Sequence, residues 1–470
     1  MATEESFDIA IVGCGAAGMS TAVSFAETAA SNGNEARIAL LERSPEDERG
    51  GSSRWTRAAM RMDQSFNLDP KWVGELQRVS EGLSDLEYSL AFAEAVPETG
   101  RFLADHGVEF FHASKRLGLG NSNFASPNGG GLAIVDNLAK SLDGHSGVRF
   151  FYETEAVALS VGDSGQVDGV TVRTTEGEMR VLRAPTVMLA CGGFEGNYEM
   201  LTRYLGPNAS RIRRLVPGTR FNMGDGIRMA IEIGASTAGQ FDRAHLEAID
   251  VRTDRPDAVI LGHNFCVVVD SDAKRFYDEG EENLLNSFER VAWAVWAKTP
   301  GNLAYYITDS SIMDHPYLSR FFETDVPIAK GGTVRELAVQ LSLEPDALVR
   351  TVEEFNAACD DREWDPGTYD RKATVGLDPP KSNWARPITN GPFYGVPVAA
   401  AICFTYGGLK TDNLSRVLSN GGAPIKGLYA AGEIVGLHYY VYPAATTVLR
   451  ACTFGRIAGA HAAAAMQSHF

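Results

Sequence analysis

Residues 7–18 read Phe-Asp-Ile-Ala-Ile-Val-Gly-Cys-Gly-Ala-Ala-Gly, an apolar run that leads directly into a glycine-rich turn. Such a run is typical of a buried parallel strand, and the small residues from Met19 to about Ala30 predict a helix after the turn. A second strand is predicted at 36–41, and Glu42 follows it. Strand, glycine turn, helix, strand and acid together form the pattern of a dinucleotide-binding unit.

The glycines of this pattern let the backbone approach a pyrophosphate at the N-terminus of the helix, and the acid receives a ribose hydroxyl. Glu42 lies 24 residues beyond Gly18, and the connecting residues 31–34 account for the slightly long spacing. The cofactor-binding residues predicted in this unit are Gly13, Gly15, Ala16, Ala17, Gly18, Glu42 and Arg43.

Two further segments favour FAD over NAD as the dinucleotide. A second glycine-containing stretch at 49–54 follows the second strand, so its backbone amides can lie beside a large cofactor. Near the C-terminus, a strand at 427–433 leads into a turn, and a final helix is predicted from Thr446 or Thr447. NAD enzymes rarely need their last helix to complete the site. These segments add Gly50, Gly51, Ser52, Ser53, Gly432 and Glu433 to the predicted cofactor residues.

Composition excludes several classes of protein. The chain has 470 residues, 44% of them hydrophobic, and its 48 glycines are scattered, so it is neither disordered nor fibrous. A net charge of −17 argues against nucleic acid or an anionic membrane as the main partner, although local arginines could still bind an acidic substrate. The acidic first residues do not resemble a secretory signal, no apolar stretch predicts membrane insertion, and the six dispersed cysteines suit reduced thiols. We therefore expect a cytoplasmic protein.

Six motifs in order resemble the fumarate reductase/succinate dehydrogenase flavoprotein superfamily over nearly the whole chain. They are GCGAAG with Glu42, RGGSSR at 49–54, ACGGF at 190–194, GDG at 224–226, LYAAGE at 428–433 and FGRIAG at 454–459. Residues 49–56 and 274–282 look most like tricarballylate dehydrogenase and its relatives. The Tyr442-Pro443 segment is similar to 3-ketosteroid and cyclic-ketone dehydrogenases.

The resemblance implies an α/β fold: a Rossmann-like FAD-binding domain with an inserted α+β capping domain. The expected boundaries are 1–240 and 387–470 for the discontinuous FAD-binding domain and 241–386 for the cap. Noncovalent FAD is expected, because no histidine lies among residues 50–56, where relatives attach the flavin. The resemblance implies further cofactor contacts at Ala156, Val157, Ala190, Gly192, Gly193, Asp225, Thr446, Thr447 and Val448.

The family chemistry removes two adjacent hydrogens next to a carbonyl or carboxylate, so it needs a base, a hydride acceptor and a group that stabilises the enolate. The segment 436–447 crowds aromatic rings in front of the last helix, whose N-terminus suits the negative charge of a reduced flavin. By resemblance to ketosteroid dehydrogenases, Tyr442 polarises the substrate carbonyl, helped by a second tyrosine. The catalytic candidates are Tyr442, Tyr440, Tyr439 and His438.

The chain departs from the fumarate reductases at their substrate-binding positions. Asn283 stands where those enzymes have an arginine, no arginine occurs in 442–445, and Cys403 or Phe404 replaces their histidine. Fumarate reduction is therefore disfavoured. A tricarboxylate substrate is disfavoured as well, because the cationic side chains that would bind its carboxylates are missing. A neutral or monoanionic substrate would contact residues chosen from Tyr406, Thr405, His245, His263 and Arg54.

The sequence thus predicts an FAD-dependent dehydrogenase that forms a C=C bond next to the carbonyl of a small cyclic ketone or oxo-acid. Tricarballylate-type oxidation and reduction of an activated alkene with a partner electron donor are the alternatives within the family. An FAD-binding electron-transfer or regulatory subunit is disfavoured, because the cap is large enough to enclose a substrate. Oxygen, a quinone and an electron-transfer protein are all compatible as electron acceptors. The spacing of histidines and cysteines predicts no metal.

Overall fold

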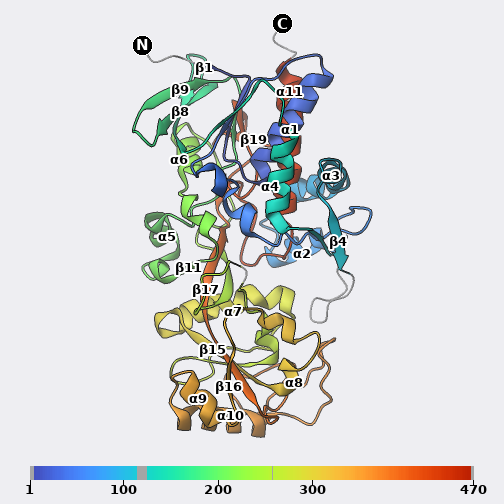
Figure 1. The fold of residues 1–470 in the computed structure, drawn as a ribbon, viewed down its shortest axis with the longest axis vertical. Coiled ribbons are helices and arrows are strands. Elements are labelled where there is room, and N and C mark those ends of the chain that lie inside the picture. Colours follow the sequence, from blue (N-terminus) through green and yellow to red (C-terminus); the bar gives the residue numbers. More distant parts are fainter. Residues whose placement is uncertain (1–4, 114–123, 257, 467–470) are drawn as a thin grey trace.

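The computed structural model describes residues 5–113, 124–256 and 258–466, so four of the six residues in the acidic N-terminal segment that does not resemble a secretory signal lie outside it. The molecule is elongated, and the strand β17 (Phe393–Thr405) runs from the lower half to the junction between the halves (Figure 1). The upper half holds the predicted nucleotide-binding segments, and the lower half holds most of residues 241–386 together with part of β17, which lies beyond the expected boundary at 387. The fold is therefore the expected one, a dinucleotide-binding α/β domain with an inserted capping domain.

A six-stranded sheet among the described residues forms the centre of the upper half. Its order is β19 (Arg416–Leu418), β20 (Pro424–Ala430), β10 (Val187–Leu189), β2 (Ile9–Val12), β3 (Ile38–Leu41) and β6 (Val148–Phe151). The pairs from β20 to β6 are parallel, and only β19 is antiparallel to its neighbour. All four residues of β2 are buried, as expected for a parallel strand covered on both faces.

The helices α1 (Ala16–Ser31) and α11 (Thr447–Ala465) pack against one another beside this sheet (Figure 1). Glycines bring the two backbones into contact: a Cβ at Gly455 would lie 2.3 Å from the Ala17 carbonyl oxygen, and one at Gly459 2.4 Å from that of Thr21. The small residues that the sequence shows in both helices thus bring the C-terminal helix to the glycine turn at the other end of the chain.

A second sheet of the upper half has the order β1 (Glu5–Ser6), β9 (Met179–Arg183), β8 (Val167–Thr174) and β7 (Thr154–Val161). The sequence suggests a tight turn at Asp168-Gly169, but this is wrong, because both residues lie inside β8. The chain turns earlier, where the N–H of Gly162 donates to the carbonyl of Gln166 at 2.9 Å. Gly169 instead allows β8 to pass close to β9, since a Cβ there would lie 2.4 Å from the Leu182 carbonyl oxygen.

The cap is built on β17, whose 13 residues are almost entirely buried. The cap sheet consists of β11 (Arg213–Arg214), β17, β15 (Ala304–Asp309) and β14 (Val267–Val269), with β13 (Ala244–Asp250) and β16 (Ala329–Gly331) also paired to β17. β17 lies in the cap sheet and ends at Thr405. Its last residues therefore lie at the junction with the upper half (Figure 1).

The sequence of the cap also predicts one helical stretch at 337–356. The structure has two helices there, α9 (Val334–Gln340) and α10 (Pro345–Ala358). Pro345 begins α10, and Glu344 before it accepts backbone N–H bonds as the N-cap. A proline at the first helical position lacks the N–H that would continue the preceding helix, which explains the break.

The remaining elements connect the sheets and cover them. The helices are α2 (Trp72–Val79), α3 (Leu86–Asp105), α4 (Gly130–Ser141), α5 (Tyr198–Leu205), α6 (Asp225–Glu232), α7 (Leu284–Lys298) and α8 (Ser310–Met313). Two small ladders join β12 (Thr237–Ala238) to β18 (Gly408–Leu409) and β4 (Phe110–Ala113) to β5 (Phe124–Pro127).

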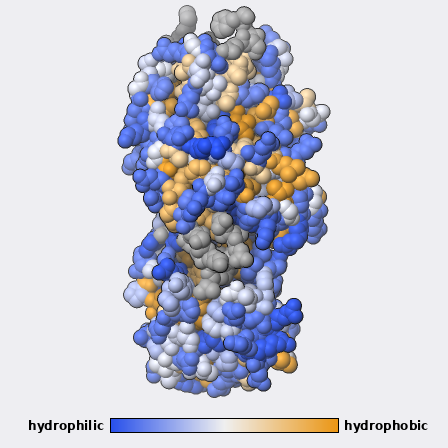
Figure 2. All heavy atoms as spheres, turned by 90° about the vertical axis from the view of Figure 1, so that its right-hand side faces the viewer, coloured by the Kyte–Doolittle hydropathy of each residue, from blue (hydrophilic) through white to orange (hydrophobic). Residues whose placement is uncertain are grey.

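The surface is mostly hydrophilic at the cap end, whereas hydrophobic residues gather on the upper half in the face drawn in Figure 2. Exposed leucines Leu83, Leu86 and Leu90 lie at the start of α3 in this half. Among the described residues, we find no helix whose length and apolar character would let it span a bilayer.

Candidate functional site

A cleft of about 850 Å³ opens at the end of β2, where the glycine turn enters α1. We call it the nucleotide cleft. It is lined by 16 of the predicted cofactor residues: Gly13, Gly15, Ala16, Ala17, Glu42, Arg43, Gly50, Gly51, Ser52, Ser53, Ala156, Ala190, Gly192, Asp225, Gly432 and Glu433. These residues come from seven separate segments of the chain, so the fold brings the predicted motifs to one place.

The turn between β2 and α1 provides the floor of the nucleotide cleft. Gly13 has a φ of +104°, and a Cβ there would lie 2.4 Å from the Ala190 carbonyl oxygen. Glu42 is buried, and one of its oxygens accepts the Cys14 N–H at 3.1 Å while the other accepts the Ser44 N–H at 3.0 Å. Each oxygen keeps further acceptor capacity for a ribose hydroxyl, so the residues fit the sugar and pyrophosphate of a dinucleotide.

The second glycine segment closes over the start of α1. Gly51–Trp55 forms a 3₁₀ helix, and the N–H of Ala16 donates to Ser53 Oγ at 3.2 Å. Opposite it, the guanidinium of Arg43 pairs with Glu155 and Asp225. Arg43 is therefore fixed at the cleft wall by two carboxylates.

Six predicted cofactor residues do not line the nucleotide cleft: Gly18, Val157, Gly193, Thr446, Thr447 and Val448. Gly18 is a packing residue, because a Cβ there would lie 1.9 Å from the Gly13 carbonyl oxygen. Sequence reasoning did not select eleven other lining residues: Val12, Cys14, Leu41, Thr154, Cys191, Phe221, Asn222, Met223, Gly226, Met229 and Ala451. Cys14, Cys191 and Gly226 stand inside the quoted motifs, so a reading of whole motifs would have included them.

Two buried carboxyl groups meet at the inner end of the nucleotide cleft. Asn222 donates to Oε1 of Glu195 at 2.9 Å, whereas Oε2 of Glu195 has no hydrogen-bond partner among the described residues. Burial, followed by the negative charge of Glu433, raises the pKa of Glu195 well above its usual value; burial also raises the pKa of Glu433. Both shifts favour the protonated, neutral form of these two carboxyl groups. Gly193 leaves room for them, since a Cβ there would lie 2.1 Å from Glu433 Oε1.

The nucleotide cleft connects to a second group of side chains through Thr405. Both its N–H and its hydroxyl donate to Glu433 Oε1, at 2.8 and 3.1 Å. Beyond Thr405 lie five buried rings, which we call the aromatic cluster: His245, Phe404, Tyr406, His438 and Tyr442. Four of the five were selected from the sequence as catalytic or substrate-contacting candidates.

The hydroxyl of Tyr442 sits at the N-terminus of α11. It accepts the backbone N–H groups of Thr446 at 2.7 Å and of Thr447 at 3.1 Å. Thr446 occupies the N-cap position, as the sequence allows, yet its side chain makes no capping bond. The phenol oxygen takes that role instead, so two backbone donors fix the ring. The O–H itself donates to Thr447 Oγ1 at 3.4 Å, a long hydrogen bond that a better acceptor can replace.

Behind the rings, a chain of hydrogen bonds joins three elements of the cap. Tyr406 donates to both oxygens of Glu289 at 2.6 Å, and Glu289 also holds His245 Nδ1 at 2.6 Å. His245 Nε2 lies 3.1 Å from Glu247 Oε1. Burial lowers the pKa of His245, but the hydrogen bonds to Glu247 and Glu289 outweigh it and raise the pKa to about 9.

The pKa of Tyr406 is raised well above its usual value by burial and by Glu289, so this phenol stays protonated. His438 is 2% exposed, and neither of its ring nitrogens has a hydrogen-bond partner among the described residues. Burial lowers the pKa of His438 well below its usual value, with Arg450 and His245 adding to the shift. A neutral imidazole with two unpaired nitrogens beside Tyr442 can bind a polar group of a ligand.

The structure does not bring the other candidates to this cluster. Tyr439 lines a separate cavity with Asp85 and Tyr88, and its hydroxyl accepts the Gly239 N–H at 3.0 Å. Tyr440 is 38% exposed. His263 lies inside the cap, where its Nε2 is 2.8 Å from Ser287 Oγ.

Arg54 stays on its own 3₁₀ segment, where it donates to the Arg49 carbonyl and lies over the Trp55 ring. Sequence reasoning also missed Glu289 and Glu247. For Glu289, the available signal was a charged residue at a buried position of the amphipathic helix α7, where only a partner could stabilise it. Glu247 lies on β13 and gave no such signal.

The pattern of the FAD-binding domain family matches residues 8–448. The chain belongs to this family. Similar proteins include the vinyl phenol reductase of Lactiplantibacillus plantarum, 26% identical over 98% of this chain and 97% of that protein. The 4-oxocyclohexanecarboxylate 2-dehydrogenase of Sinomonas cyclohexanicum is 31% identical over 63% of this chain and 54% of that protein.

Among solved structures, the open form of a flavocytochrome c3 fumarate reductase matches with a TM-score of 0.78 and 25% identity, over 98% of this chain and 78% of that chain. The expectation of a fumarate reductase-like flavoprotein is therefore confirmed, and so is FAD as its cofactor. This member of the FAD-binding domain family is an oxidoreductase that acts on CH–CH groups.

Proposed function

We propose that this flavoprotein is an α,β-dehydrogenase that forms a C=C bond next to the carbonyl of a small cyclic ketone or oxo-acid. The observation that carries the proposal is the Tyr442 hydroxyl, held by the N–H groups of Thr446 and Thr447 and facing a cluster of rings. With its oxygen already held by two donors, this phenol donates a hydrogen bond to the carbonyl oxygen and so acidifies the neighbouring α-hydrogen. The neutral imidazole of His438, whose nitrogens have no partner among the described residues and whose ring lies against Tyr442, is the available base for that proton.

The composition of the aromatic cluster supports a neutral or monoanionic ring as substrate. The buried side chains Phe404, Tyr406, Tyr442 and Ala444 pack with Leu285 and Phe288 in one hydrophobic group. Such walls stabilise an apolar ring by burial, whereas two or three carboxylates would lose their hydration there. The similarity to a 4-oxocyclohexanecarboxylate 2-dehydrogenase supports the same class, a cyclic ketone that carries one carboxylate.

FAD, bound noncovalently in the nucleotide cleft, would supply the acceptor for the hydride that leaves the β-carbon. Glu42 would hold its ribose, the turn at Gly13 and Gly15 its pyrophosphate, and the start of α11 would face the flavin. Acid precipitation of the purified protein should release free FAD into the supernatant. A flavin that stays in the pellet would contradict noncovalent binding.

The test of the reaction follows the visible flavin absorbance without oxygen while cyclohexanone, 4-oxocyclohexanecarboxylate, a 3-ketosteroid and tricarballylate are added in turn. We expect bleaching by a ketone and none by tricarballylate. Bleaching by tricarballylate alone would overturn the proposal, because it would require a cationic carboxylate site rather than the Tyr442 geometry.

Reduction of an activated alkene is the second candidate, favoured by the vinyl phenol reductase that matches over nearly its whole length. In that reaction, Tyr442 would transfer its proton to a carbon of the alkene, whereas in the dehydrogenase it would bind the carbonyl oxygen of the substrate. In this case, enzyme reduced beforehand with dithionite should reoxidise anaerobically on addition of a vinyl phenol faster than the oxidised enzyme is bleached by any ketone. For the dehydrogenase, oxygen, a quinone and an electron-transfer protein are all compatible as electron acceptors, whereas an alkene reductase would take its electrons from a partner donor.

A further inference from the structure

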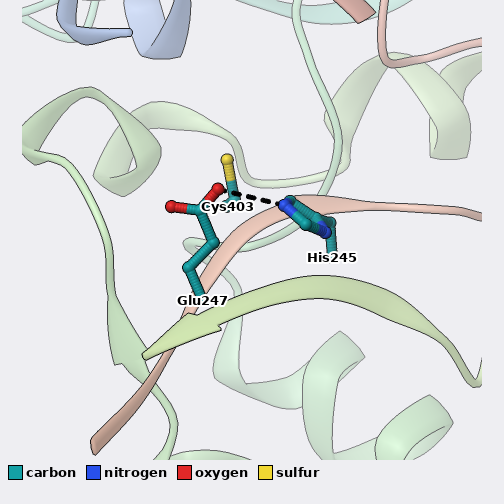
Figure 3. Close-up of side chains that lie close together, drawn as sticks. All are labelled: His245, Glu247 and Cys403. Carbon is teal, nitrogen blue, oxygen red and sulfur yellow. Dashed lines mark hydrogen bonds and ion pairs between the residues drawn. The ribbon is translucent and has the colours of Figure 1, made fainter. Parts of the chain in front are cut away.

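Three side chains with different donor atoms converge beside the aromatic cluster. The ligand atoms of His245, Glu247 and Cys403 all lie within 4.8 Å of one another, and His245 Nε2 is 3.1 Å from Glu247 Oε1. Figure 3 shows the imidazole and the carboxylate joined by this contact, with the thiol beside them. His245 and Glu247 come from β13 and Cys403 from β17, and the two strands are neighbours.

A local irregularity in the strand pairing brings the thiol to this face. His245 is paired with Phe404 and Leu246 with Ile402, so Cys403 is the extra residue of a bulge. A bulge redirects a side chain that a regular ladder would place otherwise. His245 and Glu247 are two residues apart on one strand and therefore point to the same side.

The donor set is that of a zinc site. Sulfur and imidazole nitrogen favour Zn²⁺ over Mg²⁺ or Ca²⁺, which prefer oxygen ligands. A thiolate and a carboxylate together balance the two charges of the ion. Tetrahedral zinc with bonds of about 2.0–2.3 Å separates its ligand atoms by about 3.3–3.8 Å, so the observed spacing requires only small side-chain movements.

The residues around the three ligand atoms also suit a bound metal ion. Glu289 holds the other imidazole nitrogen of His245 and is itself held by Tyr406, which is the outer support typical of a metal-binding histidine. Glu247 and Cys403 are only half-buried, so an ion can reach the three ligand atoms from solvent. We infer that His245, Glu247 and Cys403 bind one Zn²⁺ ion at the edge of the aromatic cluster.

The ion would replace the direct contact between His245 and Glu247 and occupy space next to Phe404, Tyr406 and Tyr442. If the proposed function is correct, zinc should therefore slow flavin bleaching by the substrate, and EDTA should restore it. The binding measurement below does not depend on that function, so failure of the two proposals can be told apart.

The experiment is equilibrium dialysis of the FAD-loaded enzyme against micromolar ZnCl₂, with zinc and FAD per chain measured after gel filtration. We expect one zinc per chain in the wild type. Cys403→Ser and Glu247→Gln should each weaken zinc affinity by at least tenfold while FAD content stays constant. Cys359→Ser is the matched control, because Cys359 is also half-buried but lies in the cap against the Phe355 carbonyl; it should bind zinc as the wild type does.

Two results would overturn the inference. One is a wild-type enzyme that retains no more zinc than Cys403→Ser. The other is zinc that is bound equally by wild type, Cys403→Ser and Glu247→Gln, since the ion would then lie elsewhere. Should Cys403→Ser lose FAD, the Glu247→Gln comparison decides alone.

Discussion

The nucleotide cleft and the aromatic cluster adjoin one another through Thr405, yet they are built in different ways. The cleft is made largely of backbone at glycine-rich turns, such as Gly13 with its φ of +104°. The aromatic cluster is made of side chains, and its members come from β13, β17 and the loop before α11. Backbone sites require particular residue types at fixed spacing, whereas a side-chain site can be assembled from any segments that the fold brings together.

This difference also separates binding from chemistry. The cleft residues position a dinucleotide with N–H groups, a carboxylate and close backbone approach. The aromatic cluster contains the groups that hold or move protons: Tyr442, His438 and the hydrogen-bonded chain Tyr406–Glu289–His245. A substitution in one region should therefore leave the function of the other largely intact, and four predictions test this separation.

The largest effect is expected at the floor of the nucleotide cleft. Gly13→Ala places a Cβ 2.4 Å from the Ala190 carbonyl oxygen at a backbone angle that only glycine adopts readily. We expect the purified variant to retain no FAD, measured as visible flavin absorbance per protein. Gly33→Ala is the matched control, because Gly33 also has positive φ but a Cβ there would meet no atom within 4 Å. Equal loss of FAD in both variants would contradict the steric explanation.

Tyr442→Phe should remove the proton donor while keeping the ring in its place between His245 and Phe404. The rate of anaerobic flavin bleaching by the active ketone should fall about 10²- to 10⁴-fold, with FAD content unchanged. Tyr440→Phe, at an exposed ring, should change the rate less than tenfold. If Tyr440→Phe proves the more damaging variant, the assignment of Tyr442 is wrong.

Glu289→Gln should break the support of the aromatic cluster, because it leaves a buried His245 with one carboxylate partner fewer. Removing one partner of a buried charged pair costs about 3 kcal/mol of unfolding free energy, which urea unfolding would measure. The exposed pair Glu199–Arg203 provides the control: Glu199→Gln should cost less than about 0.5 kcal/mol. Similar losses in both variants would mean that the buried network contributes no special stability.

The smallest effect concerns pH and the carboxyl pair at the inner end of the cleft. Because the pKa of Glu195 is raised in the folded protein, the folded state binds this proton more tightly than the unfolded state. The resulting stability is present at acidic pH and is lost as pH rises above the unfolded value of about 4.3 and through the raised folded value.

Glu195→Gln cannot ionise, so its unfolding free energy should fall less steeply than that of the wild type between pH 5 and 8. Urea unfolding of the two FAD-loaded proteins across this range would measure the slopes. Parallel slopes would show that the pair does not hold a proton in the native state.

Much of the nucleotide cleft could be predicted because glycine spacing and a buried acid are local requirements of dinucleotide binding. Glu42, Ser53 and Glu433 were selected from motifs, and all three line the cleft. Gly18 and Gly193 were selected for the same reason but serve packing, because the motif does not distinguish a glycine that approaches a ligand from one that approaches backbone.

The aromatic cluster was only partly predictable. Tyr442, His438 and Tyr406 were chosen by resemblance, whereas Tyr439 and Tyr440, their neighbours in the chain, point elsewhere. Adjacent residues of a loop have no fixed period, so spacing could not separate them. Glu289 is recognisable only once α7 is known to pack against β13, which makes it the partner of His245.

The sequence by itself determined the dinucleotide-binding fold, the family and the cofactor, because strands, glycine turns and helix starts are encoded over short distances. Only the tertiary structure decided which side chains meet. It placed the Tyr442 hydroxyl on the N–H groups of α11, brought Glu195 close to Glu433, and set Cys403 beside His245 through a bulge. These contacts join residues far apart in the chain. Burial shifts the pKa values of their ionisable groups and makes their hydrogen bonds specific, because it removes the water that would otherwise bind each polar group.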